Sequence, residues 1–339
     1  MSQSRRGARV RVGPLVTSGR ALGTTARCAP RAARHPGEGL VGRCTGAHPD
    51  GPSNRAREGQ VRRGRATVGA GVRGGPPPPE GTGLPVSRGS GVTPAELAAT
   101  CGSLLEPADG RFAPAEVEGL PGPVQRYFRT AIEPGTPRAR TALIAMDGRL
   151  RIGAWLPFGA AEVLTPHHGF VWWARAAGII SGSDRYVDGV GALDWRLLGL
   201  VRVMHASGPD VSRSAAARAA AEAVWLPTAL LPRFGVEWTA TDDAHLEARY
   251  AIDDQPMRVD YELTEGGHIR SVVFDRWGDP DDTGRWGFWP FGGEFTSHAT
   301  FGGVTIPDSG RLGWHYGTDR WEEGEFFRYR ITDLSLHPG

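Results

Sequence analysis

The feature that most constrains the fold is a regular alternation of apolar and polar residues in the C-terminal part of the chain. In MRVDYEL, residues 257–263, apolar or aromatic residues alternate with charged ones, and LEARYAI, residues 246–252, largely repeats the pattern. Successive side chains of a β-strand point to opposite faces, so this alternation predicts strands with one buried and one exposed face. We expect Tyr261 to face inward and Asp260 outward. Asp253 and Asp254 predict the hairpin turn between the two strands.

Similar segments recur along the chain and predict a sheet of about eight to ten strands. Residues 141–152 alternate in the same way, and further strands are expected at about 168–175, 184–198, 269–277, 311–316 and 325–336. No strand, helix, strand rhythm is present, which argues against a parallel doubly wound sheet. We therefore predict a mainly β domain with one antiparallel sheet at 140–337.

Three helices are expected beside the sheet. Short helices are predicted within 93–133, where Thr93-Pro94 and Pro121-Gly122-Pro123 are typical helix starts. An alanine-rich segment, about 209–226, predicts a helix inserted between strands. Alanine lets a helix approach another surface closely, which favours a position across the concave face of a curved sheet. A helix on the outer surface remains the alternative.

Residues 1–91 have a composition unlike the rest of the chain. Residues 1–90 hold 16 Arg against four acidic residues, a net charge of +12, and no Trp, Tyr or Phe, whereas residues 91–339 hold 23 Arg against 33 acidic residues, a net charge of −10. Such an arm cannot bury enough apolar surface to fold. We predict that it is disordered and that residues 92–339 form a single domain. One explanation for this composition is that the start of translation is assigned too far upstream in a GC-rich gene and that the true start is near Val92. The absence of lysine from the chain fits a GC-rich gene.

The arm raises the question of nucleic acid, and the sequence argues against it. Its arginines are scattered among Gly, Ala and Pro, with no aromatic residue on which a base could stack. No signal peptide or membrane span is visible. We therefore expect a cytoplasmic protein without a nucleic-acid partner. The sequence indicates nothing about its oligomeric state.

No sequence motif for catalysis, metal binding or cofactor binding is present with the spacing that it requires. The chain has no GxSxG, HExxH or CxxC motif, and a Walker motif requires a lysine. His167-His168 are adjacent and predict a turn. The loop at 279–284, DPDDTG, begins like a calcium loop, but Thr283 and Pro290 stand where oxygen ligands are needed. We expect no metal and no cofactor.

Scattered acids and histidines leave an enzyme as an alternative, because such groups can converge in space. The candidates are Asp184, Asp188, Glu222, His205 and His315. Tryptophan is more unusual: all eleven lie between Trp155 and Trp321. Tryptophan is common both in cores and in the walls of ligand pockets.

Several longer motifs point to a family. They are LPGPVQRYF at 120–128, EAVWLPTALLP at 222–232, RWGDPD at 276–281, GWHYGTDRW at 313–321 and GEFFRYRITDL at 324–334. Through them the chain resembles an uncharacterised bacterial family of unknown function, which implies no activity. The segment FGGVTIPDSGRLGWHY, residues 301–316, is similar to the late hairpin of lipoprotein-carrier half-barrels. That resemblance implies a half-barrel whose concave face holds acyl chains.

These observations favour a non-enzymatic module that binds an apolar or amphiphilic small molecule, such as a lipid, against the inserted helix. The residues expected around the ligand are Trp172, Trp195, Arg218, Glu222, Trp225 and Trp314. An acid–base enzyme of hydrolase or isomerase type, using carboxylates in the same cavity, is the second hypothesis. A structural domain whose aromatic residues only fill a core is the third.

Overall fold

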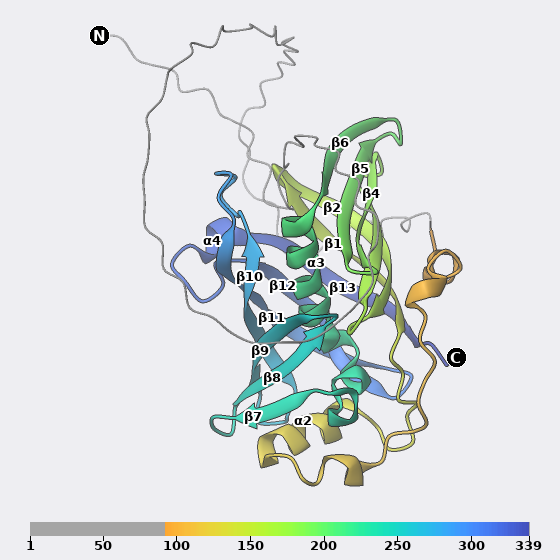
Figure 1. Cartoon of the computed structure of the whole chain (residues 1–339), viewed down its shortest axis with the longest axis vertical. Coiled ribbons are helices and arrows are strands. Elements are labelled where there is room, and N and C mark those ends of the chain that lie inside the picture. The colour runs from red at the N-terminus through yellow and green to blue at the C-terminus, as the bar shows by residue number, and fades with distance from the viewer. Residues whose placement is uncertain (1–91, 339) are drawn as a thin grey trace, which may run out of the picture. The chain divides into compact units, whose positions relative to one another are not determined.

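Thirteen antiparallel strands form one sheet in the computed structural model, which describes residues 92–338 (Figure 1). The arm predicted at 1–91 lies outside the described residues. The sheet is not closed, and its order is β6-β5-β4-β3-β2-β1-β13-β12-β11-β10-β9-β8-β7. The strands are β1 (Ala142–Ile152), β2 (Ala154–Thr165), β3 (Gly169–Ala176), β4 (Ile180–Val187), β5 (Val190–Leu197), β6 (Val201–Ser207), β7 (Glu237–Ala240), β8 (His245–Ile252), β9 (Gln255–Leu263), β10 (Ile269–Gly278), β11 (Gly287–Phe301), β12 (Val304–Trp314) and β13 (Glu325–Leu336).

The order consists of two meanders joined by the last strand. β1 to β6 pair in sequence and run toward one edge, and β7 to β12 pair in sequence and return from the other edge. β13 closes the gap because it pairs with β1 on one side and with β12 on the other. The C-terminal strand therefore holds the two halves of the sheet together.

The predicted alternation gives the correct register for β8 and β9. Tyr261 is 2% exposed and lies opposite Leu246 on β8 and Val272 on β10. The side chain of Asp260, by contrast, is 41% exposed. The inward face of this hairpin was therefore predicted correctly.

The sheet has more strands than the eight to ten expected from sequence. Residues 184–198, predicted as one strand, are divided between β4 and β5. The turn between them lies at Asp188 and Gly189, which both adopt positive φ, at 52° and 76°. A two-residue turn of this kind matches the twist of a tight hairpin. The chain therefore reverses direction at Asp188 and Gly189, in the middle of the segment that was predicted as one strand.

Helix α3 (Pro209–Glu222) crosses the concave face of the sheet, as predicted, and a 3-10 turn, η3 (Ala223–Trp225), extends it (Figure 1). It contacts β5 in one half of the sheet and β10 in the other. These strands are eight places apart in the sheet order, roughly 38 Å if the sheet were flat at about 4.8 Å per strand. A helix is only about 10 Å across, so the sheet must curve around it. The buried alanines of α3 permit this close approach.

The remaining helices are short and lie around the sheet. The first of the short helices predicted within 93–133 is α1 (Pro94–Ala98), which begins with a capping box at Thr93 and is followed by a 3-10 turn. Its Leu97 packs with Ala161 and Val163 of β2 in a cluster separate from the main core. The other helical segments are α1 (Pro94–Ala98), η1 (Gly102–Leu104), η2 (Pro114–Val117), α2 (Gly122–Ala131), η4 (Pro227–Leu230), η5 (Pro232–Phe234) and α4 (Trp321–Gly324).

Candidate functional site

A partly enclosed cavity lies between α3 and the concave face of the sheet. Its volume, counted as the space open to the centre of a water molecule, is about 80 Å³. Most of its lining is apolar and aromatic, with four buried ionisable residues among it: Asp184, Arg218, Glu222 and Arg276.

Arg218 and Glu222 face the cavity from α3, one helical turn apart. The Nε of Arg218 lies 2.6 Å from Oε1 of Glu222, and its Nη1 lies 2.9 Å from Oδ2 of Asp184 on β4. The guanidinium also stacks over the rings of Phe170 and Trp172 at 4.4 and 5.1 Å. Burial alone would lower the pKa of Arg218, but the charges of Glu222 and Asp184 outweigh it and raise the pKa. Arg218 is therefore a fixed cation.

The side chain of Asp184 is held by the neighbouring strand β5 and by α3. Besides the ion pair with Arg218, its Oδ1 accepts a hydrogen bond of 2.8 Å from the indole N–H of Trp195 on β5. Burial nevertheless raises the pKa of Asp184, although Arg218 and Trp195 oppose the rise. The hydrogen bond from Trp195, which does not line the cavity, orients the carboxylate of Asp184.

Glu162 on β2 is a third buried carboxyl group in this cluster, and it is not among the site residues predicted from the sequence. It is fully buried, and neither oxygen has a hydrogen-bond partner among the described residues when both glutamates are ionised; the same holds for Oε2 of Glu222. Burial and then the charge of Glu222 raise the pKa of Glu162 well above its usual range, and a hydrogen bond to Glu222 adds to the rise. One proton shared between the two glutamates satisfies Oε2 of Glu222 and one of the two oxygens of Glu162.

Arg276 on β10 is the second cation at the cavity. Its Nε donates to the backbone oxygen and hydroxyl of Ser214 on α3, both at 3.2 Å. The guanidinium packs over Phe291 and Trp314 at 4.6 and 5.1 Å. Its two terminal nitrogens make no hydrogen bond to a described residue. Burial, and then the charge of Arg218, lower the pKa of Arg276 to about 9.

The charges of this cluster balance when Glu162 is protonated. Arg218 and Arg276 are then offset by Asp184 and Glu222. Buried charges are tolerated only when paired and hydrogen-bonded. The donors of Arg276 and the indole N–H of Trp172, which is buried without a partner among the described residues, are the unused hydrogen-bonding capacity at the cavity.

Comparison with known proteins gives a family but no activity. Residues 110–326 match the family of unknown function DUF6544. The chain belongs to this family. No curated protein matches it. Among solved structures, a domain from Vibrio parahaemolyticus assigned to outer membrane lipoprotein sorting has 8% identity and a TM-score of 0.32, covering 59% of this chain and 86% of that one.

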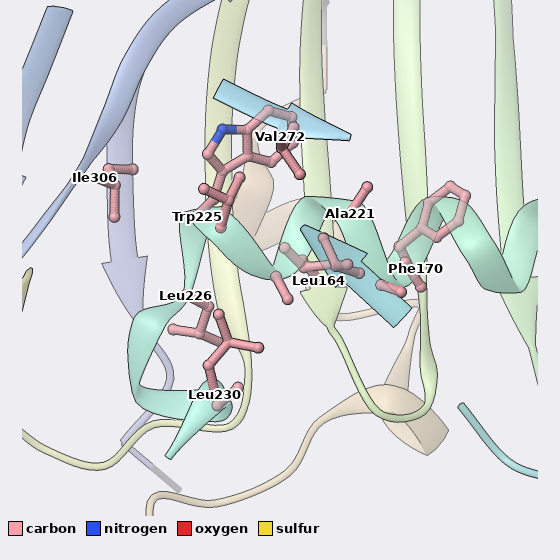
Figure 2. Close-up of a cluster of buried hydrophobic side chains, with 14 of the residues drawn as sticks. Leu164, Phe170, Ala221, Trp225, Leu226, Leu230, Val272 and Ile306 are labelled. Atoms are coloured by element: carbon pink, nitrogen blue, oxygen red, sulfur yellow. The ribbon is translucent and has the colours of Figure 1, made fainter. Parts of the chain in front are cut away.

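The tryptophans predicted to line the site of this DUF6544 domain divide into two groups. Trp172 and Trp225 line the cavity, whereas Trp195 and Trp314 lie behind it, against Asp184 and Arg276. Trp225 is 1% exposed and its indole N–H donates to the hydroxyl of Tyr329 at 3.1 Å. Figure 2 shows Trp225 in the apolar cluster beyond the end of α3, with Leu226 and Leu230.

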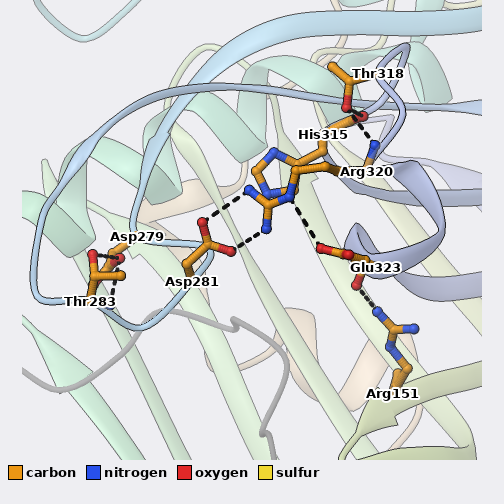
Figure 3. A network of polar contacts seen from close by, with 8 residues as sticks. All are labelled: Arg151, Asp279, Asp281, Thr283, His315, Thr318, Arg320 and Glu323. Carbon is orange, nitrogen blue, oxygen red and sulfur yellow. Dashed lines mark hydrogen bonds and ion pairs between the residues drawn. The ribbon is translucent and has the colours of Figure 1, made fainter.

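The remaining catalytic candidates do not join this cluster in the DUF6544 domain. Asp188 and His205 are exposed, and His315 is buried against Trp289. His315 lies beside a polar network in which Arg320 binds Asp281 and Glu323, at 2.6 and 3.2 Å (Figure 3).

The loop at 279–284 is held by hydrogen bonds to the side chain of Asp279. Asp279 accepts hydrogen bonds from the N–H groups of Thr283 and Gly284 (Figure 3). Within residues 92–338, no cluster of three or more His, Cys, Asp or Glu has a metal-binding arrangement. No helix in the same range is long and apolar enough to cross a bilayer.

Glu162 could have been noticed from the sequence. Glu162 is the one charged residue in the run AWLPFGAAEVLT of β2, a segment that is otherwise buried for most of its length. A lone acid in such a run either faces out or needs a partner. Periodicity does not decide between these, because the partner lies on α3, about sixty residues away in the chain.

Proposed function

We propose that this domain binds a small amphiphilic molecule in the cavity between α3 and the sheet. The observation that carries the proposal is an apolar, aromatic-walled cavity with hydrogen-bond donors that lack acceptors: the buried indole N–H of Trp172 and the terminal nitrogens of Arg276. The apolar part of the ligand would lie among Phe170, Phe291 and Phe327, and an acceptor oxygen would meet Arg276 and Trp172. Ligand sites in proteins commonly have this composition, mostly apolar with a few converging polar groups.

The balance of charge in the cluster indicates which kind of head group the ligand should have. With Glu162 protonated the cluster is neutral, so an anionic head group would add an unbalanced charge beside Asp184 and Glu222. A neutral acceptor, such as an ester carbonyl, would satisfy the donors of Arg276 without that penalty. We therefore expect the methyl ester of a fluorescent fatty acid to bind more tightly than the free acid.

Native mass spectrometry of the purified protein and titration with both probes test the proposal. Ala215→Leu fills the cavity from α3 and should weaken binding roughly tenfold or more, as expected when ligand and side chain compete for the same volume. Ala95→Leu, on the exposed face of α1, is the matched control and should change nothing. Thermal unfolding of each variant separates lost binding from lost fold. If the wild-type protein carries no bound ligand and shows no saturable binding, the proposal is wrong, and the domain is a structural one whose aromatic residues only fill a core.

An acid–base enzyme is the second candidate, because three carboxyl groups, those of Glu162, Asp184 and Glu222, converge with two arginines and burial raises the pKa of two of them. A general acid or base must reach the proton that it transfers. Glu162 is fully buried and does not line the cavity, while Asp184 and Glu222 are engaged by Arg218. Binding is therefore favoured over turnover.

The same ester probe distinguishes the two candidates. Release of free fatty acid by wild type, abolished by Glu222→Gln, would establish an esterase; retention of intact ester would support a binder. The cytoplasm stays the predicted location, which cell fractionation checks directly.

A further inference from the structure

Two neighbouring hairpin turns present a group of exposed apolar side chains at one end of the sheet. The β3–β4 turn carries Ile179, and the β5–β6 hairpin, at the top of Figure 1, carries the others. The two turns touch, because the N–H of Leu198 donates to the carbonyl of Ile179 at 2.7 Å. We call this group the apolar tip: Ile179, Leu198, Leu200, Val201 and Val203, which are 49%, 67%, 81%, 61% and 51% exposed.

The apolar tip is not a random scatter of surface residues. Seven large hydrophobic side chains are exposed among the described residues, and five of them belong to the tip. Single exposed apolar residues are ordinary, but a contiguous group marks an interaction surface. Leu198 also has a φ of 53°, in the left-handed region that bulky residues avoid. A strained turn position is thus occupied by a leucine that points into solvent.

The charge around the tip is opposite to that of the rest of the domain. Residues 173–183 and 195–209 contain no Asp or Glu and include Arg175, Arg196 and Arg202. The nearest acid along these strands is Asp194, which pairs with Arg196 at 3.3 Å and Arg202 at 3.2 Å, so the tip keeps a surplus of two positive charges. Residues 91–339 together have a net charge of −10.

We propose that the apolar tip docks on the surface of an anionic lipid bilayer. Leucine, isoleucine and valine on turns would enter the boundary between head groups and acyl chains, while the arginines just behind them meet lipid phosphates. The negative charge of the remaining surface is repelled by the same membrane, which orients the domain tip first. This surface is independent of the cavity. It would bring a binder of amphiphiles to the source of its ligand.

Two other occupants of the tip are disfavoured. β6 is an edge strand and could pair with β6 of a second copy. Antiparallel pairing would place the two tips at opposite ends of the joined strands and leave Leu198 and Leu200 uncovered. Residues 1–90 carry a net charge of +12, the same sign as the tip, so they do not complement it either. An anionic surface does.

The test is sedimentation of the full chain with vesicles of phosphatidylglycerol and phosphatidylcholine in equal parts, and with phosphatidylcholine alone. The double variant Leu198→Asn, Leu200→Ser removes the two most exposed apolar side chains, and asparagine tolerates the left-handed position. We expect it to reduce binding to anionic vesicles roughly tenfold or more. Val190→Ser, a 57% exposed valine at the turn between β4 and β5, is the matched control and should bind as wild type does.

Two results would overturn the proposal. If the double variant binds anionic vesicles as tightly as wild type, the arginine-rich arm or another surface is responsible. If wild type binds no vesicles but forms a dimer that the double variant loses, measured by light scattering after gel filtration, the tip is a protein interface. Arg175→Gln combined with Arg202→Gln should weaken binding to anionic vesicles and reduce its dependence on salt. Unchanged salt dependence would refute the role of the arginines.

Discussion

Replacing Glu162 by glutamine should stabilise the protein at neutral pH. Glu162 is fully buried on β2 beside Glu222, and burial raises its pKa well above the usual range. Glutamine has nearly the same shape and cannot ionise. Its amide N–H can donate to the free oxygen of Glu222 in place of the shared proton. The substitution therefore keeps the contacts and removes the titration.

The sign and size of the effect follow from linkage between folding and protonation. In the unfolded chain a glutamate has a pKa of about 4.3, whereas in the folded protein the pKa of Glu162 is raised. The stabilising contribution of the protonated group is complete below about pH 4.3 and is lost as the pH rises through the folded pKa. In that window the free energy of unfolding falls by about 1.4 kcal/mol per pH unit. The Glu162→Gln variant cannot ionise at this position, so its free energy of unfolding does not fall for this reason as the pH rises.

The measurement is chemical denaturation of wild type and variant at pH 5, 6, 7 and 8. The difference in free energy of unfolding should grow in favour of the variant, by at least about 1.4 kcal/mol and at most about 4 kcal/mol over this range. Glu265→Gln, at an exposed loop position, is the control and should show no growing difference. A difference for Glu162→Gln that stays flat, or that declines with pH, would show that the carboxyl group is ionised or solvated in the folded protein.

Three further predictions concern stability. Tyr261→Ala should cost about 3–5 kcal/mol by emptying a buried aromatic site, whereas Asp260→Ala should stay within about 0.5 kcal/mol; equal costs in denaturation would contradict the register of β9. Gly278→Ala should cost about 1–3 kcal/mol because the new Cβ would lie 2.2 Å from the indole ring of Trp314, while Gly119→Ala, with nothing within 4 Å, should be nearly neutral. Asp184→Asn should cost about 3–5 kcal/mol by leaving an arginine without one of its buried partners; a smaller loss would mean that solvent reaches the pair.

Local patterns predicted β1, β3, β8, β9, β10 and β13, and missed β2, β6, β7 and β11. β8 and β9 follow their alternation closely, and α3 begins at Pro209 as predicted but ends at Glu222, before residue 226. β11 was missed because its sequence, GFWPFGGEFTSHATF, contains a proline and three glycines, which argue against a strand interior. Gly292 is required there, since a Cβ would lie 2.1 Å from the carbonyl oxygen of Val272 on β10. Only the neighbouring strand explains that glycine.

Only those parts of the candidate site that depend on local sequence could be predicted. Arg218 and Glu222 are four residues apart on one helix, so their pairing follows from helical geometry. Trp172 and Trp225 were chosen by residue type, and both line the cavity. Glu162 was overlooked because its partner is not local.

The sequence by itself determined which face of each regular strand is buried, where the alanine-rich helix begins, and that Arg218 and Glu222 share a face. These properties depend on residues within one or two turns or strands. The tertiary structure alone decided that β13 joins the two meanders and that the sheet curves around α3. That curvature brings Glu162 from β2 and Arg276 from β10 to the same helix. Pairing between distant strands leaves no trace in local periodicity, so the buried charge cluster exists only once the chain has folded.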